Sequence, residues 1–371
     1  MRVGIPAEVK NNEFRVAITP SGVHELVAHG HEVLVQAGAG DGSSIPDSAY
    51  REAGATITPD AATTWGSAEL VLKVKEPIAS EYGYFREDLV LFTYLHLAAE
   101  PELTTALLES GITAIAYETV QLPSRALPLL APMSEVAGRL APIVGANVML
   151  RPNGGPGLLV PGVPGTHPAS IVVLGGGVAG TNAVSVAVGL GADVTVLDTN
   201  IQRLRELDAL YAGRIHTIAS NTLEIDRAVV SADMVIGSVL VPGAKAPKLV
   251  SNELVSRMKP GSVLVDIAID QGGCFADSHP TTHADPTFTV HNSLFYCVAN
   301  MPGAVANTST YALTNATMPY VRAVANLGWR DALRADAALA LGLNVRGGSV
   351  VNEAVATAHE LDHLPLEQAL A

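Results

Sequence analysis

Short apolar runs alternate with segments of helical periodicity along the first third of the chain. Segments such as 19–30 and 101–111 carry apolar residues at helical spacing. The apolar runs around them predict strands at 1–6, 31–36, 69–74, 89–96 and 113–118. Strands that alternate with helices form βα units, so this pattern predicts a largely parallel sheet.

A second series of apolar runs begins near residue 170. It predicts strands at 171–176, 193–198, 214–219, 232–239, 262–270, 288–292 and 294–299. A helical stretch, 134–150, and a Gly/Pro-rich connection, 151–168, precede the series and indicate a domain boundary. After the series the chain is predicted to be helical, without partner strands, at 309–326, 329–343 and 349–361.

The second series opens with IVVLGGGVAG, an apolar strand that runs into a glycine-rich turn and a helix. Gly175 suits the tight turn, Gly177 the approach of a pyrophosphate, and Gly180 close packing of the helix on its strand. Free N–H groups at the helix start attract phosphate. Asp198 ends the next strand, 18 residues after Gly180, close to the ~20 expected of an acid that binds an adenosine ribose. These features together predict a dinucleotide site.

The predicted fold is therefore α/β, with two Rossmann-like domains built on parallel sheets. We expect the second domain to be inserted into the first and joined to it by long hinge helices. Residues 1–128 and 307–371 form the discontinuous substrate and catalytic domain in this prediction, and residues 129–306 form the NAD-binding domain.

Composition narrows the class of protein. The 371 residues are 48% hydrophobic and 16% charged, with a formal net charge of −14, which argues against nucleic acid as a partner. The mean hydropathy is +0.30, yet no apolar run approaches the ~18 residues of a membrane span. Cys274 and Cys297 form neither a disulfide framework nor a zinc pattern. We expect no metal, no membrane partner, no export signal and a cytoplasmic location.

Polar residues at predicted strand ends are candidates for chemistry, because ligands of α/β proteins bind there. Lys75, which the pattern places on one strand face with Lys73, suits an anionic ligand, with an ion pair to Glu76 as the alternative. His96 ends its strand, and a free histidine, with a pKa near ~6.5, suits proton transfer near neutrality, although a structural histidine is the alternative. Arg15 can bind a carboxylate through two hydrogen bonds.

The strand that ends in VDIAIDQGG offers two carboxylates. Asp270 precedes a Gly-Gly turn from which it can project into a cleft, and Asp266 competes for the same role. Capping of the following loop is the alternative for both. Asn300 follows the last predicted strand and can both donate and accept hydrogen bonds. Ser134 has the position of a helix N-cap.

With these residues identified, the chain resembles the alanine dehydrogenase family over essentially its whole length. The segments that carry the resemblance are MRVGIPAEVKNNEFRVAITPSGV, LKVKEP, LFTYLHLAAE, AYETVQ, APMSEVAGRL, LGGGVAGTNAV, VLVPGAKAPKLV, VDIAIDQGGCF and YCVANMPGAV. The resemblance implies a cytoplasmic homohexamer that interconverts L-alanine with pyruvate and ammonium, using NAD as cofactor.

The resemblance also implies roles for individual residues. Arg15, Lys75 and Asn300 are expected to bind substrate, and His96 and Asp270 to be catalytic. The residues expected to line the NAD site are Ser134, Gly175, Gly177, Val178, Gly180, Asp198, Arg203, Ser220, Val239, Leu240, Ile267, Asp270, Val298, Asn300 and Met301.

Three positions depart from the family pattern: Pro156, Ala306 and Asn307. They lie in connecting segments, so they bear on domain closure or subunit contacts more than on chemistry. The alternatives to an alanine dehydrogenase are a dehydrogenase of a longer amino acid, of the lysine or saccharopine type, and a non-catalytic NAD-binding or transhydrogenase-like component. The presence of Arg15, Lys75, His96 and Asp270 together favours the dehydrogenase.

Overall fold

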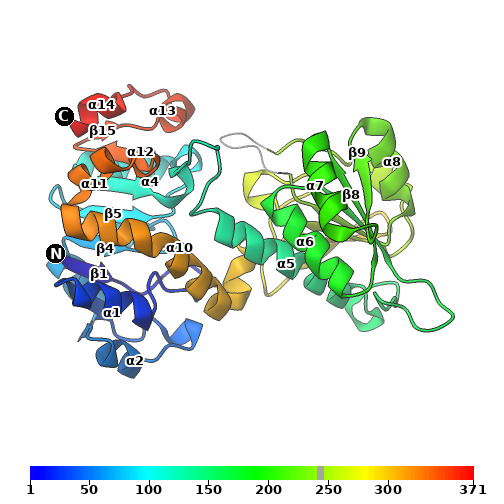
Figure 1. Cartoon of the computed structure of the whole chain (residues 1–371), viewed down its shortest axis with the longest axis horizontal. Helices are drawn as coiled ribbons and strands as arrows, with labels where there is room; N and C mark the ends of the chain where they lie inside the picture. Colours follow the sequence, from blue (N-terminus) through cyan, green and yellow to red (C-terminus); the bar gives the residue numbers. More distant parts are fainter. Residues whose placement is uncertain (240–245) are drawn as a thin grey trace. The chain divides into compact units, whose positions relative to one another are not determined.

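The computed structural model describes residues 1–239 and 246–371, and these form two compact units. Unit 1 comprises residues 1–133 and 305–371, and unit 2 comprises residues 134–304 (Figure 1). Each unit has its own mostly parallel sheet with helices packed against it. The predicted α/β class with two Rossmann-like sheets is therefore confirmed.

The sheet of unit 1 has eight strands among the described residues, in the order β15-β14-β6-β5-β4-β1-β2-β3. Its strands are β1 Arg2–Ile5, β2 Glu32–Gln36, β3 Thr56–Thr58, β4 Leu70–Leu72, β5 Val90–Thr93, β6 Thr113–Ala116, β14 Leu343–Arg346 and β15 Ser349–Val350. The chain starts at β1, builds outward to β3 and then crosses back to β4. The strand order therefore reverses between β1 and β4, where α/β sheets bind ligands.

The prediction that the late helices lack partner strands is wrong. β14 pairs antiparallel with β6, where Leu343 lies opposite Ile115, and β15 pairs antiparallel with β14. Both strands are short, and only Gly347 and Gly348 separate them, so their alternation is hard to distinguish from the helical pattern around them. The helices of unit 1 are α1 Pro20–Ala28, α2 Asp47–Glu52, α3 Ala61–Ser67, α4 Pro101–Ser110, α10 Ala306–Leu327, α11 Trp329–Ala335, α12 Ala337–Ala340, α13 Glu353–His359 and α14 Leu366–Leu370.

The sheet of unit 2 has seven strands in the described segments, in the order β12-β13-β11-β10-β7-β8-β9. They are β7 Ser170–Leu174, β8 Asp193–Asp198, β9 His216–Ala219, β10 Met234–Gly237, β11 Val263–Asp266, β12 Thr287–Val290 and β13 Ser293–Tyr296. Among these described strands, only β12 is antiparallel to its neighbour. The strand order reverses between β7 and β10. The helices are α5 Ala131–Val148, in which the unit boundary falls, α6 Val178–Gly189, α7 Ile201–Tyr211, α8 Thr222–Ser231 and α9 Asn252–Ser256.

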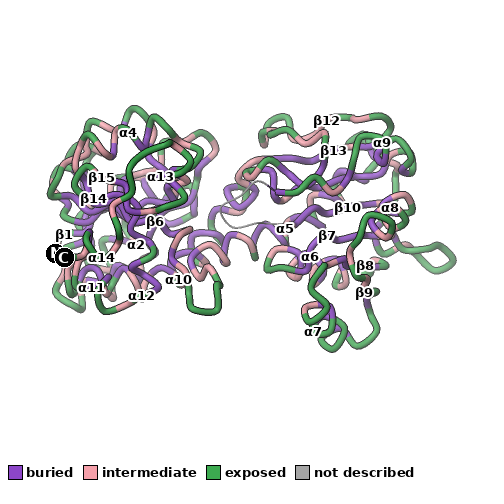
Figure 2. Tube along the Cα trace, turned by 90° about the horizontal axis from the view of Figure 1, so that it is seen from above, coloured by how far each residue is buried: buried purple, intermediate pink, exposed green. Residues whose placement is uncertain are grey.

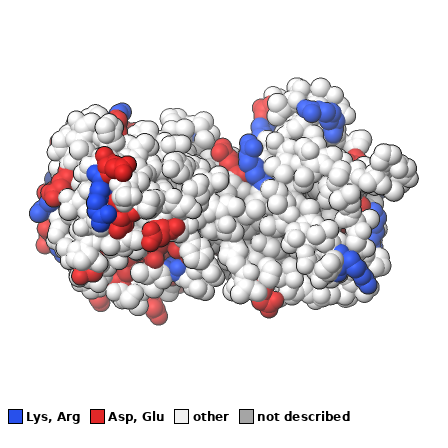
Figure 3. Space-filling model, turned by 90° about the horizontal axis from the view of Figure 1, so that it is seen from below, with Lys and Arg blue, Asp and Glu red and all other residues white. Residues whose placement is uncertain are grey.

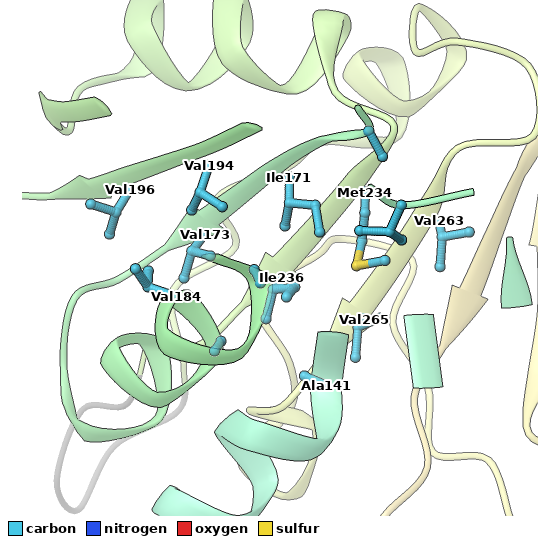
Figure 4. Packing of buried hydrophobic residues seen from close by; sticks show 14 of the residues in the cluster. Ala141, Ile171, Val173, Val184, Val194, Val196, Met234, Ile236, Val263 and Val265 are labelled. Atoms are coloured by element: carbon cyan, nitrogen blue, oxygen red, sulfur yellow. The ribbon is translucent and has the colours of Figure 1, made fainter. Parts of the chain in front are cut away.

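The central strands of the unit 2 sheet, β7, β10 and β11, are buried on both faces, as strands of a parallel sheet covered by helices must be. Ile171 and Val173 of β7 face one cluster of buried side chains, and Val172 and Leu174 face another. Figure 4 shows the first cluster, in which side chains of β7, β8, β10 and β11 pack near Ala141 of α5. The buried strands of both units are purple in Figure 2. Within residues 1–239 and 246–371, no helix is long and apolar enough to cross a membrane.

Candidate active site

The glycine turn after β7 has the backbone that a dinucleotide site needs. Gly175 has φ +100°, a conformation that other residues rarely adopt. A Cβ on Gly180 would lie 1.8 Å from the Gly175 carbonyl oxygen, so α6 approaches the turn as closely as a glycine permits. A Cβ on Gly177 would meet no described atom within 4 Å. The turn is therefore closed on its protein side and open beside Gly177.

The first turn of α6 can hold an anion. Gly177 is its N-cap, and no side chain in the described part of the chain caps its N–H groups. These groups carry the positive end of the helix dipole, which favours phosphate. Val178 is 45% exposed at the same place. The turn thus fits the pyrophosphate of a dinucleotide.

Asp198 ends β8 beside this turn. One carboxylate oxygen accepts a hydrogen bond from the Gly176 N–H at 2.6 Å, and the other accepts one from the Asn200 N–H at 2.7 Å. The Ser220 N–H bonds to the backbone oxygen of Asp198 at 2.9 Å. Because each carboxylate oxygen can accept more than one hydrogen bond, Asp198 retains acceptor capacity for ribose hydroxyls.

Arg203, in the first turn of α7, reaches back to the glycine turn. Its Nε donates to the Gly176 oxygen at 2.6 Å, and its Nη2 donates to the Thr181 hydroxyl at 2.6 Å. Its Nη1 pairs with Glu206 at 2.8 Å. All three guanidinium nitrogens therefore contact groups of the protein.

The other predicted cofactor residues follow the ends of neighbouring strands. Val239 follows β10, Ile267 follows β11, and Val298 and Met301 follow β13. Leu240 lies outside the described residues. The sequence reasoning missed Ser238, which is buried and whose hydroxyl donates to the carbonyls of Leu174 and Gly175 at 2.9 Å each. The sequence signal that could have found Ser238 is its position as a small polar residue directly after a buried strand.

The two competing carboxylates after β11 have different surroundings. Asp266 is wholly buried and accepts hydrogen bonds from the N–H groups of Ala268, Cys274 and Phe275 and the hydroxyl of Ser278. Burial raises the pKa of the Asp266 carboxyl, against the effect of these bonds. Asp270 is exposed, in a short helical turn, Ile269–Gln271. Asp266 therefore caps the loop, and Asp270 remains the carboxylate that can meet a ligand.

Asn300 and Ser134 also lie in unit 2. Asn300 has a left-handed backbone, φ +62°, and its carbonyl accepts a bond from the Gly303 N–H at 2.9 Å. The N-cap reading of Ser134 is wrong, because α5 begins at Ala131 and Ser134 lies inside its first turns. Pro132 is tolerated there because the first helical N–H groups need no partner within the helix.

In unit 1, Arg15 is buried and held by a neighbouring acid. Its guanidinium donates to Glu13 from Nε at 2.7 Å and from Nη2 at 2.6 Å. Its Nη1 lies 3.0 Å from the Met133 sulfur. Burial opposes the charge, but the hydrogen bonds and charge of Glu13 raise the pKa of Arg15 above its ordinary value. The two-point binding of a carboxylate expected of Arg15 is thus made with Glu13 in this structure.

Lys75 and Lys73 follow β4 but do not share an environment, contrary to the expectation that they lie on one strand face. The pleat ends at Leu72, so residue alternation no longer applies beyond it. Lys73 is wholly buried between Glu8 and Glu81, at 3.0 and 2.9 Å. Lys75 lies 3.6 Å from Glu76 and is 16% exposed.

Glu76 joins Lys75 to other charged groups of the same sheet edge. It is buried and also pairs with Lys10. Burial alone would raise the pKa of the Glu76 carboxyl, but Lys75, Lys10 and His96 outweigh it and hold the pKa below its ordinary value. Outside such buried groups, the face in Figure 3 shows acidic and basic side chains in small, separate groups.

His96 follows β5 in a left-handed conformation, φ +50°. Its ring stacks on Tyr94 with 5.8 Å between centroids and 5° between planes. Glu118, which the sequence reasoning missed, accepts the His96 backbone N–H at 2.6 Å and lies 3.9 Å from the ring Nδ1. Arg15 interacts electrostatically with Tyr94, and His96 with Glu76. Unit 1 therefore gathers Arg15, Lys75 and His96 at one edge of its sheet.

Other parts of the described structure offer weaker sites. Cavities of about 260 and 240 Å³ lie beside α1 and α10 of unit 1 and beside α8 of unit 2, away from the residues above. Across the described ranges, no group of three or more His, Cys, Asp or Glu side chains could hold a metal ion.

Comparison with known proteins agrees with this arrangement. Residues 4–137 match the family model "Alanine dehydrogenase/PNT, N-terminal domain", and residues 141–353 match "Alanine dehydrogenase/PNT, C-terminal domain". The chain is 64% identical to an alanine dehydrogenase of Mycobacterium tuberculosis (strain CDC 1551 / Oshkosh), over 96% of each chain. It is 60% identical to that of Mycolicibacterium smegmatis, over the full length of both.

Solved structures give the same result. An L-alanine dehydrogenase structure superimposes with a TM-score of 0.94 at 51% identity, over 97% of this chain and 99% of that one. A transhydrogenase structure from Sinorhizobium meliloti gives a TM-score of 0.82 at 28% identity, over 95% of this chain and all of that one. The chain belongs to the alanine dehydrogenase/PNT family.

Proposed function

We propose that this protein is an NAD-dependent L-alanine dehydrogenase, which interconverts L-alanine with pyruvate and ammonium. The observation that carries the proposal is similarity to alanine dehydrogenases over the full length of the chain. The chain also has polar side chains suited to the reaction in each unit. Arg15, Lys75 and His96 lie at one sheet edge in unit 1, and Asp270 lies exposed after β11 in unit 2.

The glycine turn and Asp198 are the proposed NAD site. N–H groups at the start of α6 bind the pyrophosphate, and Asp198 accepts hydrogen bonds from the adenosine ribose. The open space beside Gly177 and the uncapped helix start support this assignment. When bound, NAD supplies the acceptor for the hydride that leaves the amino-bearing carbon.

The residues of unit 1 bind the substrate in this proposal. Arg15 binds the carboxylate, and Lys75 stabilises negative charge on the carboxylate or on the developing carbonyl oxygen. His96 moves a proton between the substrate oxygen and solvent. Asp270 positions the amine and the attacking water, and Asn300 contributes a further polar contact.

Consumption of NADH with pyruvate and ammonium tests the proposal, with larger 2-oxo acids assayed in parallel. We expect pyruvate to give the highest kcat/KM. Activity only with a larger oxo acid would indicate a dehydrogenase of a longer amino acid. NAD binding without activity on any oxo acid would indicate a non-catalytic or transhydrogenase-like component.

The homohexameric state and the cytoplasmic location are also proposed from the resemblance. Exposed apolar side chains near the Gly/Pro-rich connection support an assembly, because such patches are commonly covered by partners. They are Leu150, Leu158, Leu159 and Val163. Light scattering of the purified protein measures the number of subunits.

A further inference from the structure

We propose that Arg203 is a positioning residue, which fixes the glycine turn for the pyrophosphate. The proposal rests on NAD binding at residues 175–180, and it adds to the role that the resemblance gives to Arg203. It follows from the hydrogen bonds around Gly176, the middle glycine of the turn.

Hydrogen bonds join the turn, β8 and α7 in a closed ring. Asp198 accepts the N–H groups of Gly176 at 2.6 Å and of Asn200 at 2.7 Å. The Asn200 side chain accepts the Arg203 N–H at 3.2 Å, as the N-cap of α7. The Arg203 Nε returns to the Gly176 oxygen at 2.6 Å, which closes the ring.

The ring fixes both peptide groups of Gly176. Asp198 holds the N–H of the peptide that precedes it, and Arg203 holds the carbonyl of the peptide that follows. The Thr181 hydroxyl also donates to this carbonyl, at 3.0 Å, and accepts from Arg203. In a trans peptide the C=O and N–H groups point in opposite directions. Holding the Gly176 oxygen toward Arg203 therefore directs the Gly177 N–H toward the open side of the turn, where a phosphate would lie.

The packing around Gly176 leaves little freedom for another arrangement. A Cβ on Gly176 would lie 3.0 Å from Leu207 Cδ1, 3.3 Å from an Asp198 carboxylate oxygen and 3.4 Å from Arg203 Cγ. The Arg203 Nη1 could exchange its exposed pair with Glu206 at little cost. Its Nε and Nη2 could reach a ribose phosphate only by releasing the turn. The geometry thus assigns Arg203 to the turn.

Arg203→Met and Arg205→Met test the assignment, with NAD binding followed by calorimetry. Both substitutions remove one positive charge from α7. The Arg205 side chain is exposed and has no hydrogen bond or ion pair within the described residues, so Arg205→Met controls for long-range attraction of the pyrophosphate. We expect Arg203→Met to weaken NAD about tenfold to a hundredfold, the effect of losing bonds from a charged donor. Arg205→Met should change the NAD affinity less than twofold.

Smaller ligands separate an effect at the phosphates from an effect at the ribose. Arg203→Met should weaken ADP-ribose about as much as NAD, and adenosine, which lacks phosphate, much less. Thr181→Val should lower the NAD affinity of the Arg203→Met protein by less than it lowers that of the wild type. The two effects overlap because both side chains donate to the Gly176 carbonyl. Thr181→Ser, which keeps the hydroxyl, should behave as wild type.

Two outcomes would overturn the positioning role: a loss of adenosine binding in Arg203→Met as large as its loss of NAD binding, or equal effects of Arg203→Met and Arg205→Met. Absence of NAD binding by the wild-type protein would instead overturn the proposed function. The two failures are therefore distinguishable.

Discussion

The carboxylate of Glu13 occupies the Nε and Nη2 side of the Arg15 guanidinium, with hydrogen bonds of 2.7 and 2.6 Å. Both side chains are nearly inaccessible to water. This pairing orients the guanidinium plane before any substrate is present. A lysine carries the same charge but cannot donate two parallel hydrogen bonds from a planar group.

Arg15→Lys should therefore raise the KM for pyruvate, by roughly tenfold, the effect of one lost charge-assisted hydrogen bond. Steady-state kinetics with varied pyruvate measures it. Arg51→Lys, on the exposed surface of α2, is the matched control and should leave KM unchanged. An unchanged KM in Arg15→Lys would remove Arg15 from the substrate site.

His96→Ala and Asp270→Asn should lower kcat by roughly 10²–10⁴-fold, the usual contribution of general acid–base catalysis. NAD affinity should change little, because neither side chain belongs to the glycine turn. Parallel kinetics and calorimetry separate the two effects. If NAD affinity falls in step with kcat, the two residues are structural instead.

Strand periodicity predicted most of the fold, because buried parallel strands are continuous apolar runs. The exceptions were β3, β14 and β15, which have between two and four residues each. Such short strands exist because neighbours supply their hydrogen bonds, as β6 does for β14. That pairing is a tertiary contact, so a local pattern cannot reveal it.

The candidate site was predictable in part. The glycine turn could be predicted because each glycine meets a local backbone requirement. The distinction between Asp266 and Asp270 could not, since it depends on N–H groups contributed by residues 268–275. The burial of Arg15 against Glu13 likewise depends on packing around the side chains.

Asp198→Ala should weaken NAD by about 1.5–3 kcal/mol for each charge-assisted hydrogen bond lost. It should also narrow the preference for NAD over NADP, because the carboxylate no longer repels a 2′-phosphate. Values of kcat/KM for both cofactors measure the change. Asp208→Ala, which removes an exposed carboxylate from α7, is the control. Equal use of NAD and NADP by the wild type would show that Asp198 is not the ribose ligand.

Asp266→Asn should destabilise unit 2. The amide has one acceptor oxygen where the carboxylate has two, and Asp266 uses both oxygens, one for Ala268 and the other for Cys274, Phe275 and Ser278. At least one buried donor is then left unpaired, at a cost of about 1–3 kcal/mol. Urea unfolding measures the loss. Asp277→Asn, on the exposed part of the same loop, should cost much less, and equal losses would contradict the capping role.

Glu76→Gln should lower the free energy of unfolding at neutral pH by an amount that shrinks in acid. The carboxyl has a folded-state pKa below its ordinary 4.5, because Lys75, Lys10 and His96 outweigh the effect of burial. A lowered pKa means that ionised Glu76 stabilises the fold. This contribution is complete above the unfolded pKa of 4.5 and is lost as the pH falls through the folded pKa. Burial raises the pKa of the Glu8 carboxyl, so ionised Glu8 destabilises the fold. Glu8 is present in both proteins, and its effect therefore cancels when their free energies of unfolding are subtracted.

Urea unfolding of the wild type and Glu76→Gln at a series of pH values measures this difference directly. We expect this difference to fall below about pH 4.5, where the wild-type carboxylate takes up its proton. Glu25→Gln, which breaks the half-exposed pair with Arg322, should cost only about 0–1 kcal/mol at neutral pH. A Glu76→Gln difference that does not vary with pH would show that the charges of Lys75, Lys10 and His96 do not stabilise this carboxylate.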